Sequence, residues 1–232
     1  MGTENPNVDH GKCDAQKEHW ESVYSSNTDK FGTTPSEPAK ITSTLLKKES
    51  KTSLIELGAG QGRDTLYFAR SGFNVTALDY SHKGIEAINI TATDQCLDDS
   101  IQTVQQDVRE LLPFENDSFD ACYSHMLYCM PLSKSELSKL SSEIYRILKP
   151  GGLNIFTTRN TKDPQYRTGL HRGEGLWEID GGFIVHFLSK EDISKLCEDF
   201  EILQIDNFEE GMIPSLNEPK KLYIVVTRKP GL

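Results

Sequence analysis

One segment constrains the fold of this chain more than any other: Leu54–Asp64, which reads LIELGAGQGRD. A short apolar run ends in alternating glycines, and a helical pattern begins at about Arg63. Glycines let a backbone approach a ligand closely, and a helix that begins beside them directs free N–H groups and a positive dipole to the same point. The segment therefore predicts a strand, a ligand-binding turn and a helix, in that order.

The next apolar run leads to a second candidate ligand-binding residue. Asn74–Leu78 has the pattern of a strand and is followed directly by Asp79. A carboxylate at the end of the second strand of such a fold can accept hydrogen bonds from both hydroxyls of a ribose. The two segments together predict a site for a cofactor that carries a nucleoside.

The glycine spacing and one acidic residue help to choose between cofactors. Gly58, Gly60 and Gly62 have the spacing G-x-G-x-G, whereas dinucleotide-binding turns have G-x-G-x-x-G. Glu56 lies near the end of the first strand, where it would repel a pyrophosphate and attract a cationic ligand group. Both observations count against a nicotinamide cofactor.

The alternation of strand and helix patterns along the chain predicts the fold class. Strands are expected at 53–57, 73–78, 101–106, 118–124, 152–158, 200–208 and 221–228, and helices at 16–24, 36–48, 63–71, 82–93, 133–148 and 189–198. This rhythm is typical of a parallel sheet that is covered by helices on both faces. Residues 159–187 interrupt it, because they are rich in glycine, charged and aromatic residues without a clear period.

Three further segments carry a resemblance to a known family. Gln105–Val108 follows one apolar run, Phe119–His125 follows an acidic turn, and Leu148–Leu153 reads LKPGGL. Together with the glycine turn and Asp79, they make the chain resemble the class I S-adenosylmethionine-dependent methyltransferases over residues 18–160. The resemblance implies a Rossmann-like α/β fold, with a doubly wound, seven-stranded, mostly parallel sheet whose last strand is antiparallel. It also implies S-adenosylmethionine as cofactor and S-adenosylhomocysteine as product.

The resemblance also implies which residues bind the cofactor: Trp20, Tyr24, Glu56, Gly58, Ala59, Gly60, Gly62, Arg63, Asp79, Tyr80, Ser81, Asp107, Val108, Ser124 and His125. Several of these have a second interpretation. Glu56 holds the cofactor ammonium or only orders the turn, and Arg63 faces the cofactor carboxylate or the surface. Asp107 accepts from the adenine amino group or caps the next turn. Trp20 and Tyr24 belong to a lid helix or only pack an amphipathic helix.

The acceptor site is expected where the fourth and fifth strands end. His125 is the candidate for proton transfer in catalysis, with a structural histidine as the alternative. The segment after the fifth strand commonly builds the acceptor pocket in this family. The expected acceptor-binding residues are Tyr128, Arg159, Tyr166, His171 and His186. Within residues 54–81, the sequence is similar to small methyltransferases of the tellurite-resistance and thiol type.

Composition limits the remaining possibilities. The net charge of −10 argues against nucleic-acid binding, and no apolar run is long enough to span a membrane. The five cysteines form no metal-binding or disulfide pattern, so we expect no metal and a cytoplasmic location. We expect a disordered tail at 1–13 and one domain at 14–232, with lid helices in 14–50 and an insertion at 159–187 over the acceptor pocket.

The activity that follows is methyl transfer to a small-molecule acceptor by a monomer or homodimer. Two alternatives stay open from the sequence alone. One is a non-catalytic S-adenosylmethionine-binding protein, whose cofactor site would have the same residues. The other is a nicotinamide-dependent oxidoreductase, which the glycine spacing disfavours.

Overall fold

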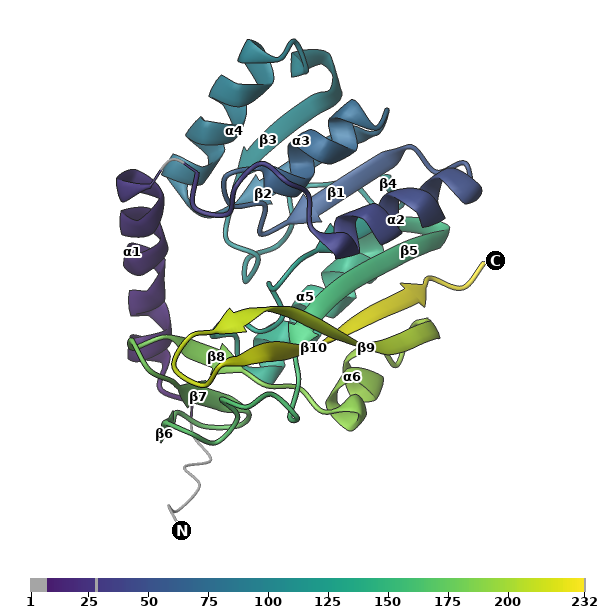
Figure 1. Cartoon of the computed structure of the whole chain (residues 1–232). Coiled ribbons are helices and arrows are strands. Elements are labelled where there is room, and N and C mark those ends of the chain that lie inside the picture. Colours follow the sequence, from purple (N-terminus) through teal and green to yellow (C-terminus); the bar gives the residue numbers. More distant parts are fainter. Residues whose placement is uncertain (1–7, 28, 232) are drawn as a thin grey trace.

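The computed structural model describes residues 8–27 and 29–231, and a seven-stranded sheet forms its centre (Figure 1). Its strands are β1 (Ser53–Leu57), β2 (Asn74–Asp79), β3 (Ile101–Gln105), β4 (Phe119–Ser124), β5 (Leu148–Arg159), β9 (Glu201–Ile213) and β10 (Glu218–Arg228). They lie in the order β3-β2-β1-β4-β5-β10-β9. The first five are parallel, and β10 is antiparallel to both of its neighbours. The predicted fold class is confirmed.

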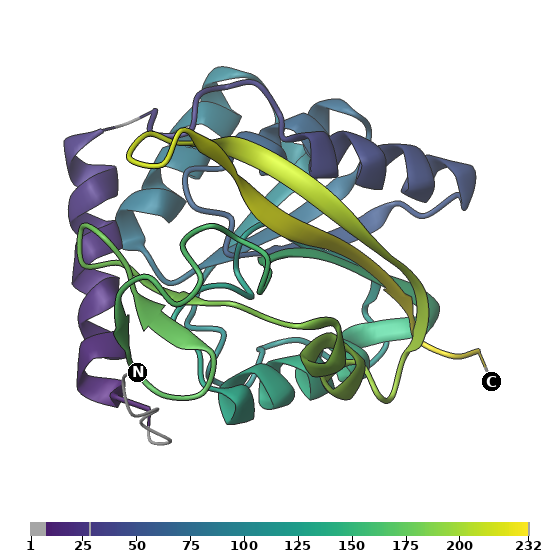
Figure 2. The ribbon, with the colours of Figure 1, turned by 60° about the horizontal axis from the view of Figure 1, so that its bottom comes forward.

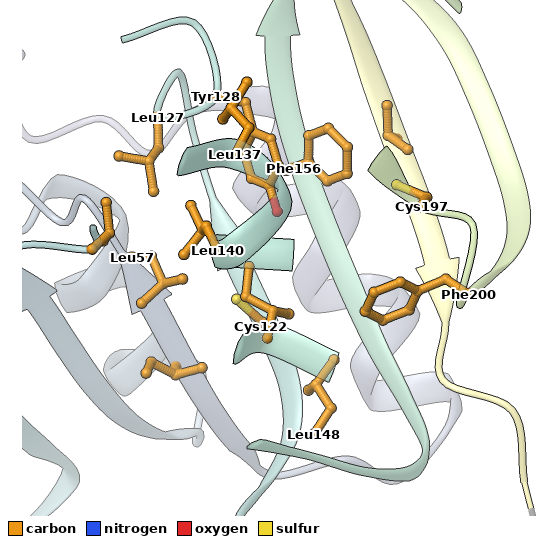
Figure 3. Close-up of a cluster of buried hydrophobic side chains, with 14 of the residues drawn as sticks. Leu57, Cys122, Leu127, Tyr128, Leu137, Leu140, Leu148, Phe156, Cys197 and Phe200 are labelled. Atoms are coloured by element: carbon orange, nitrogen blue, oxygen red, sulfur yellow. The ribbon is translucent and has the colours of Figure 1, made fainter. Parts of the chain in front are cut away.

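Helices cover both faces of this sheet because successive strand residues point to opposite sides. Leu54 packs with one buried cluster, beneath α2 (Glu37–Lys48), α3 (Arg63–Arg70) and α4 (His82–Asp94). Ile55 and Leu57 pack with the other cluster, beneath α5 (Lys134–Ile147) and α6 (Lys190–Leu196). Figure 3 shows the second cluster, in which Leu57 and Cys122 of the sheet lie close to Leu140 of α5.

Serine side chains begin four of these helices. Ser36, Ser81, Ser133 and Ser189 each accept a hydrogen bond from a backbone N–H in the first turn of the helix that follows. Such caps satisfy N–H groups that have no partner within the helix, and each typically contributes about 1 kcal/mol. The predicted starts of these helices are therefore confirmed, and with them the positions of the loops between strands and helices.

The segment 159–187 is more ordered than its composition indicates. It contains a small antiparallel sheet of β6 (Leu170–His171), β7 (Leu176–Glu178) and β8 (Ile184–His186). This sheet packs against α1 (His10–Ser26) through a cluster of Cys13, Leu176 and Ile184. Figures 1 and 2 show α1 beside both this sheet and α4, so α1 bridges the insertion and the main domain.

The hairpin of β9 and β10 is longer than the sequence patterns predict. Strands were expected at 200–208 and 221–228, but the two strands stay paired as far as Ile213 and Glu218. Because β5 pairs only with Leu222–Arg228, the distal part of the hairpin extends past the sheet. In Figures 1 and 2 its yellow tip lies on the same side of the molecule as α1 and the small sheet.

The N-terminal prediction is partly wrong. Residues 10–13 were assigned to a disordered tail, yet they form the first turn of α1. Asp9 caps that turn by accepting from the Lys12 N–H, and the Cys13 side chain is buried against the small sheet. Residues 1–7 lie outside the described part of the chain. Among the residues that are described, no helix is both long and apolar enough to cross a membrane.

Candidate functional site

A cavity of about 980 Å³ lies at the carboxyl ends of the parallel strands. Ligands of open α/β sheets bind at this edge, where the loops after neighbouring strands converge. On one side the wall comes from the loops after β1, β2 and β3. On the other side it comes from the loops after β4 and β5 and from the β9–β10 hairpin. Helix α1 and the small sheet also contribute to the wall.

The glycine turn has a backbone that other residues rarely adopt. Gly58, Gly60 and Gly62 all have positive φ, at 71°, 57° and 84°. A Cβ at Gly62 would lie 2.6 Å from Cγ1 of Ile88, and one at Gly60 would lie 2.9 Å from the hydroxyl oxygen of Tyr24. The turn therefore needs glycine both for its conformation and for space. Gly58 and Gly60 line the cavity, whereas Gly62 caps α3 and faces Ile88 instead.

Asp79 holds this turn in place at the end of β2. Its Oδ2 accepts the Gly60 N–H at 2.8 Å, and its Oδ1 accepts the Ser81 N–H at 2.8 Å. Burial raises the pKa of Asp79 above its ordinary value. A carboxylate has about four acceptor positions, so both oxygens can still accept a ligand hydroxyl. Asp79 lines the cavity, whereas Ser81 caps α4 and does not line it.

Glu56 also lines the cavity, as a buried carboxyl group beside α3. Its Oε2 accepts a hydrogen bond from Thr65 at 2.5 Å. Burial, and secondly the charge of Asp64, raise the pKa of Glu56 to about 8. A cationic ligand group beside Glu56 would oppose that rise, because a positive charge favours the ionised carboxylate. The site thus fits a ligand with an ammonium group.

Arg63 faces the cavity but already has a partner. Its Nε and Nη2 lie 3.0 and 3.1 Å from the two carboxylate oxygens of Asp64, which also accepts from Ser36 and Tyr123. Burial alone would raise the pKa of Asp64, but Arg63 and Ser36 hold it below its ordinary value. Asp64, which was not among the residues predicted from the sequence, lines the cavity next to the predicted Arg63.

Helix α1 forms part of the cavity wall beside the glycine turn. Trp20 and Tyr24 both line the cavity. The ring of Trp20 lies 6.2 Å from the ring of Phe183, the residue just before β8. Gln16 donates to the carbonyl of Gly182 at 3.2 Å, and the Glu21 carboxylate accepts from Ser81. The first and the second half of the helix are therefore attached to different parts of the fold, as a covering element would be.

Asp107 follows β3 and lies under the same helix. It pairs with Lys17 of α1 and with Arg109, whose backbone N–H it also accepts at 3.0 Å. Burial alone would raise the pKa of Asp107, but the hydrogen bonds from Arg109 and Lys17 lower it to about 2. The hydrogen bond from the Arg109 N–H to Asp107 is the turn cap that was the alternative interpretation of Asp107. Ala59, Tyr80, Asp107 and Val108 all line the cavity.

The other half of the cavity contains a histidine–carboxylate pair. His125 follows β4, and its Nε2 lies 2.9 Å from Oε2 of Glu210 on β9. Its Nδ1 lies 2.9 Å from Oγ1 of Thr157 on β5. His125 and Glu210 both line the cavity. Glu210 was not predicted from the sequence. It is 85 positions away from His125, and the strand that carries it was predicted to end at residue 208.

Of the residues expected to bind the acceptor, only Arg159 lines the cavity. Its guanidinium is buried and donates to Asp163 and to Gln165, and it lies 5.0 Å from the centre of the Phe187 ring. Because these partners neutralise and orient it, Arg159 supports the wall more than it offers a free charge. Gln165, which lines the cavity beside it, was missed.

Four other expected acceptor residues point elsewhere. Tyr128 is fully buried and stacks on Phe156 at 3.9 Å, because its segment turns into the core after β4. His186 is buried behind the small sheet, where its Nδ1 lies 2.7 Å from the Leu132 carbonyl oxygen and burial lowers its pKa. Tyr166 and His171 pack with the Trp177 ring, outside the cavity wall.

Ser124, expected to bind the cofactor, is also absent from the wall. It is fully buried at the end of β4, and within the described residues its hydroxyl has no hydrogen-bond partner. The side chain of the next residue, His125, points into the cavity instead, because successive residues of a strand alternate in direction.

Comparison with known proteins agrees with this geometry. Residues 55–156 match the family model of a methyltransferase domain. Malonyl-acyl-carrier-protein O-methyltransferase from Erwinia billingiae is 29% identical over 127 residues, which cover 54% of this chain and 43% of that protein. The chain therefore aligns with less than half the length of this curated relative.

Solved structures share the fold at low sequence identity. The 1,6-didemethyltoxoflavin-N1-methyltransferase of Burkholderia thailandensis, solved with S-adenosylhomocysteine, has a TM-score of 0.71 and 17% identity, covering 99% of this chain and 93% of that chain. TehB from Haemophilus influenzae has a TM-score of 0.63 and 19% identity, covering 80% of this chain and 60% of the TehB chain. The chain is thus similar to methyltransferase domains over residues 55–156, and it shares its fold with an S-adenosylmethionine-dependent methyltransferase from Methanosarcina mazei, at a TM-score of 0.68 and 19% identity, covering 78% of this chain and 94% of that chain.

Proposed function

We propose that this protein is an enzyme that transfers a methyl group from S-adenosylmethionine to a small-molecule acceptor. One observation carries the proposal: a single cavity joins the region of Asp79 and the glycine turn to a second region after β4, β5 and β9. A cofactor in the first region and an acceptor in the second would share one enclosed space. Methyl transfer needs this arrangement, because acceptor, methyl and sulfur must lie in a line.

The cofactor half is assigned residue by residue. Asp79 accepts from the ribose hydroxyls, the turn of Gly58 and Gly60 lies along the methionyl part, and Glu56 faces the ammonium group. Asp107 and Val108 flank the adenine. The hydrogen bonds that fix Asp79 against Gly60 support this assignment, because they hold the carboxylate at the cavity edge before any ligand arrives.

S-adenosylmethionine supplies a methyl group that is already activated, so the residues of this chain have to bind, align and exclude water. Alignment lowers such a barrier by about 7–11 kcal/mol in favourable cases. The positive charge on sulfur disappears in the reaction, so a dry site favours it. Trp20 of α1 and Phe183 beside the small sheet form the apolar cover that this requires.

The acceptor is proposed to be a small molecule. The cavity of about 980 Å³ is at the upper end of the range for small-molecule sites. It also has to contain the cofactor, so the space left for the acceptor is that of a small molecule. The net charge of −10 opposes binding to nucleic acid. We further propose a cytoplasmic location, because all five cysteines are free thiols in the described residues. The proposed assembly is a monomer or homodimer.

Calorimetric titration with S-adenosylhomocysteine, with NADH as control, tests the cofactor first. Micromolar binding of S-adenosylhomocysteine alone would support the proposal, whereas binding of NADH alone would favour an oxidoreductase. Transfer of a labelled methyl group from S-adenosylmethionine to a panel of small molecules then tests the activity. Binding without transfer to any acceptor would favour the non-catalytic alternative.

A further inference from the structure

A chain of hydrogen bonds leads from the main sheet into the acceptor half of the cavity. The Met126 N–H donates to Oγ1 of Thr157 at 2.9 Å, and the same Oγ1 lies 2.9 Å from Nδ1 of His125. Nε2 of His125 then lies 2.9 Å from Oε2 of Glu210. The loop after β4 and the strands β5 and β9 thus contribute to one line of polar groups that ends at a carboxylate.

The donor directions in this chain follow from its last member. The Glu210 carboxylate can only accept, so Nε2 of His125 carries a proton and donates to it. In the neutral imidazole with this tautomer Nδ1 accepts, so the Thr157 hydroxyl, which itself accepts from the Met126 N–H, donates to Nδ1. Both ring nitrogens of His125 are then occupied, so the acceptor-facing group of this chain is Glu210 and not the histidine.

Glu210 is ionised and only partly satisfied. Burial alone would raise its pKa, but the hydrogen bond from His125, and then the charges of Arg63 and Lys220, hold it below the ordinary value. Within residues 8–27 and 29–231, no hydrogen bond or ion pair occupies its second oxygen, Oε1. By contrast, the neighbouring charges of Arg63 and Arg159 are each matched by an aspartate.

The rest of this half of the cavity is largely apolar. Met126, Met130 and Met212 line it, and they are all the methionines of the chain apart from Met1. Met212 follows Glu210 across a register shift of the hairpin at Gly211, and both residues line the cavity. Methionines are flexible and polarisable, which suits the flat face of an aromatic ligand. A carboxylate with a free acceptor position in such a wall selects for a matching donor.

We propose that Glu210 accepts the N–H or O–H proton of the acceptor molecule, and that His125 and Thr157 are positioning residues that hold its carboxylate. The acceptor is then an apolar, ring-sized molecule that is methylated at a protonated nitrogen or oxygen. This inference rests on the proposed methyltransferase function and specifies its substrate class.

The step balances without any further reactant. The lone pair of the acceptor atom forms the new bond to the methyl carbon as the bond between that carbon and sulfur breaks. The sulfur keeps the electron pair of the broken bond and becomes a neutral thioether. The acceptor proton passes to Oε1 of Glu210, which changes from carboxylate to carboxylic acid. One positive and one negative charge disappear together, and the site becomes neutral as it reacts.

Binding provides a first test that does not depend on turnover. Phenols, fused N–H heteroaromatics and their O- or N-methylated analogues are titrated into the complex with S-adenosylhomocysteine. We expect the wild type to prefer a protic probe over its methylated analogue by at least about tenfold, as a hydrogen bond to a charged group would give. Glu210→Gln should lose the preference. The matched control is Glu209→Gln, since Glu209 is the exposed neighbour that pairs with Lys221 instead.

Kinetics provide the second test, with two phenols of which one is protonated and the other ionised at neutral pH. For 4-methoxyphenol, which is protonated at neutral pH, we expect Glu210→Gln to lower kcat by about 10²–10⁴-fold. For pentafluorophenol, which is already ionised, the same variant should be as fast as the wild type or faster, because a carboxylate repels an anion. His125→Gln and Thr157→Val should slow only the protonated phenol, and by less.

The possible outcomes separate the two proposals. Failure to bind S-adenosylhomocysteine would overturn the proposed function itself. Binding of S-adenosylhomocysteine together with no binding or methylation of any protic aromatic probe would overturn only the substrate class. Equal losses for both phenols in Glu210→Gln, or no loss for either, would overturn the role of Glu210.

Discussion

Replacing Asp79 with alanine is the most direct test of the cofactor site. Its carboxylate is buried, and each oxygen already accepts one backbone N–H, from Gly60 or Ser81. The remaining acceptor positions face the cavity, where we expect the two ribose hydroxyls. A hydrogen bond to a charged group contributes about 1.5–3 kcal/mol, and 1.4 kcal/mol corresponds to about a tenfold change in affinity. Losing even one of them predicts at least about a tenfold weaker binding of S-adenosylhomocysteine.

The assay is calorimetric titration of wild type and Asp79→Ala, with thermal unfolding of each to establish that the variant is folded. The Gly60 and Ser81 N–H groups lose their partner in this variant, which costs stability, while removal of a buried charge offsets part of that cost. Asp79→Asn keeps the size of the side chain and provides a second, milder variant. Asp99→Ala, at an exposed position, is the control. A folded Asp79→Ala that binds as tightly as the wild type would refute the assignment.

Three further outcomes are expected. Trp20→Ala should weaken binding of S-adenosylhomocysteine, because Trp20 lines the cavity from α1; equal affinities by calorimetry would show that α1 does not act as a lid. Glu56 gives a pH dependence: its pKa rises from 4.5 unfolded to about 8 folded, so the folded state retains a proton that the unfolded chain has released. The free energy of unfolding should therefore fall as pH rises from about 4.5 to 8, and denaturant titrations of Glu56→Gln should show a flatter profile; equal slopes would contradict this origin. Tyr128→Phe should leave acceptor KM unchanged, because its ring packs in the core; a raised KM would return Tyr128 to the acceptor site.

The sequence predicted those parts of the fold that depend on local patterns. The alternation of strands and helices, the starts of the helices and the glycine turn each depend on a few neighbouring residues of the chain. Positive φ at Gly58 and Gly60 is a property of the backbone that glycine alone adopts readily, so the turn could be located without any tertiary information. Most of the residues expected to bind the cofactor lie at or just after the ends of predicted strands, and for that reason they line the cavity.

The half of the cavity proposed for the acceptor was predicted less well, for a geometric reason. In that half, direction decides the role: Ser124 is buried while the next residue, His125, faces the cavity. Tyr128 and His186 have suitable chemistry, but they point into the core and behind the small sheet. Glu210 lies at the cavity because the hairpin extends past the sheet, and no local pattern in the sequence indicated that extension.

The sequence by itself determined the class of the fold and the position of the cofactor turn, because these depend on residues that are close together along the chain. Only the tertiary structure decided which charged groups are already paired and which remain available to a ligand. Arg63 and Arg159 have aspartate partners, whereas Glu210 keeps one oxygen for the cavity, held by His125 from a distant strand. Pairing of this kind depends on distances between strands, since electrostatic and hydrogen-bond energies act through space and not along the sequence.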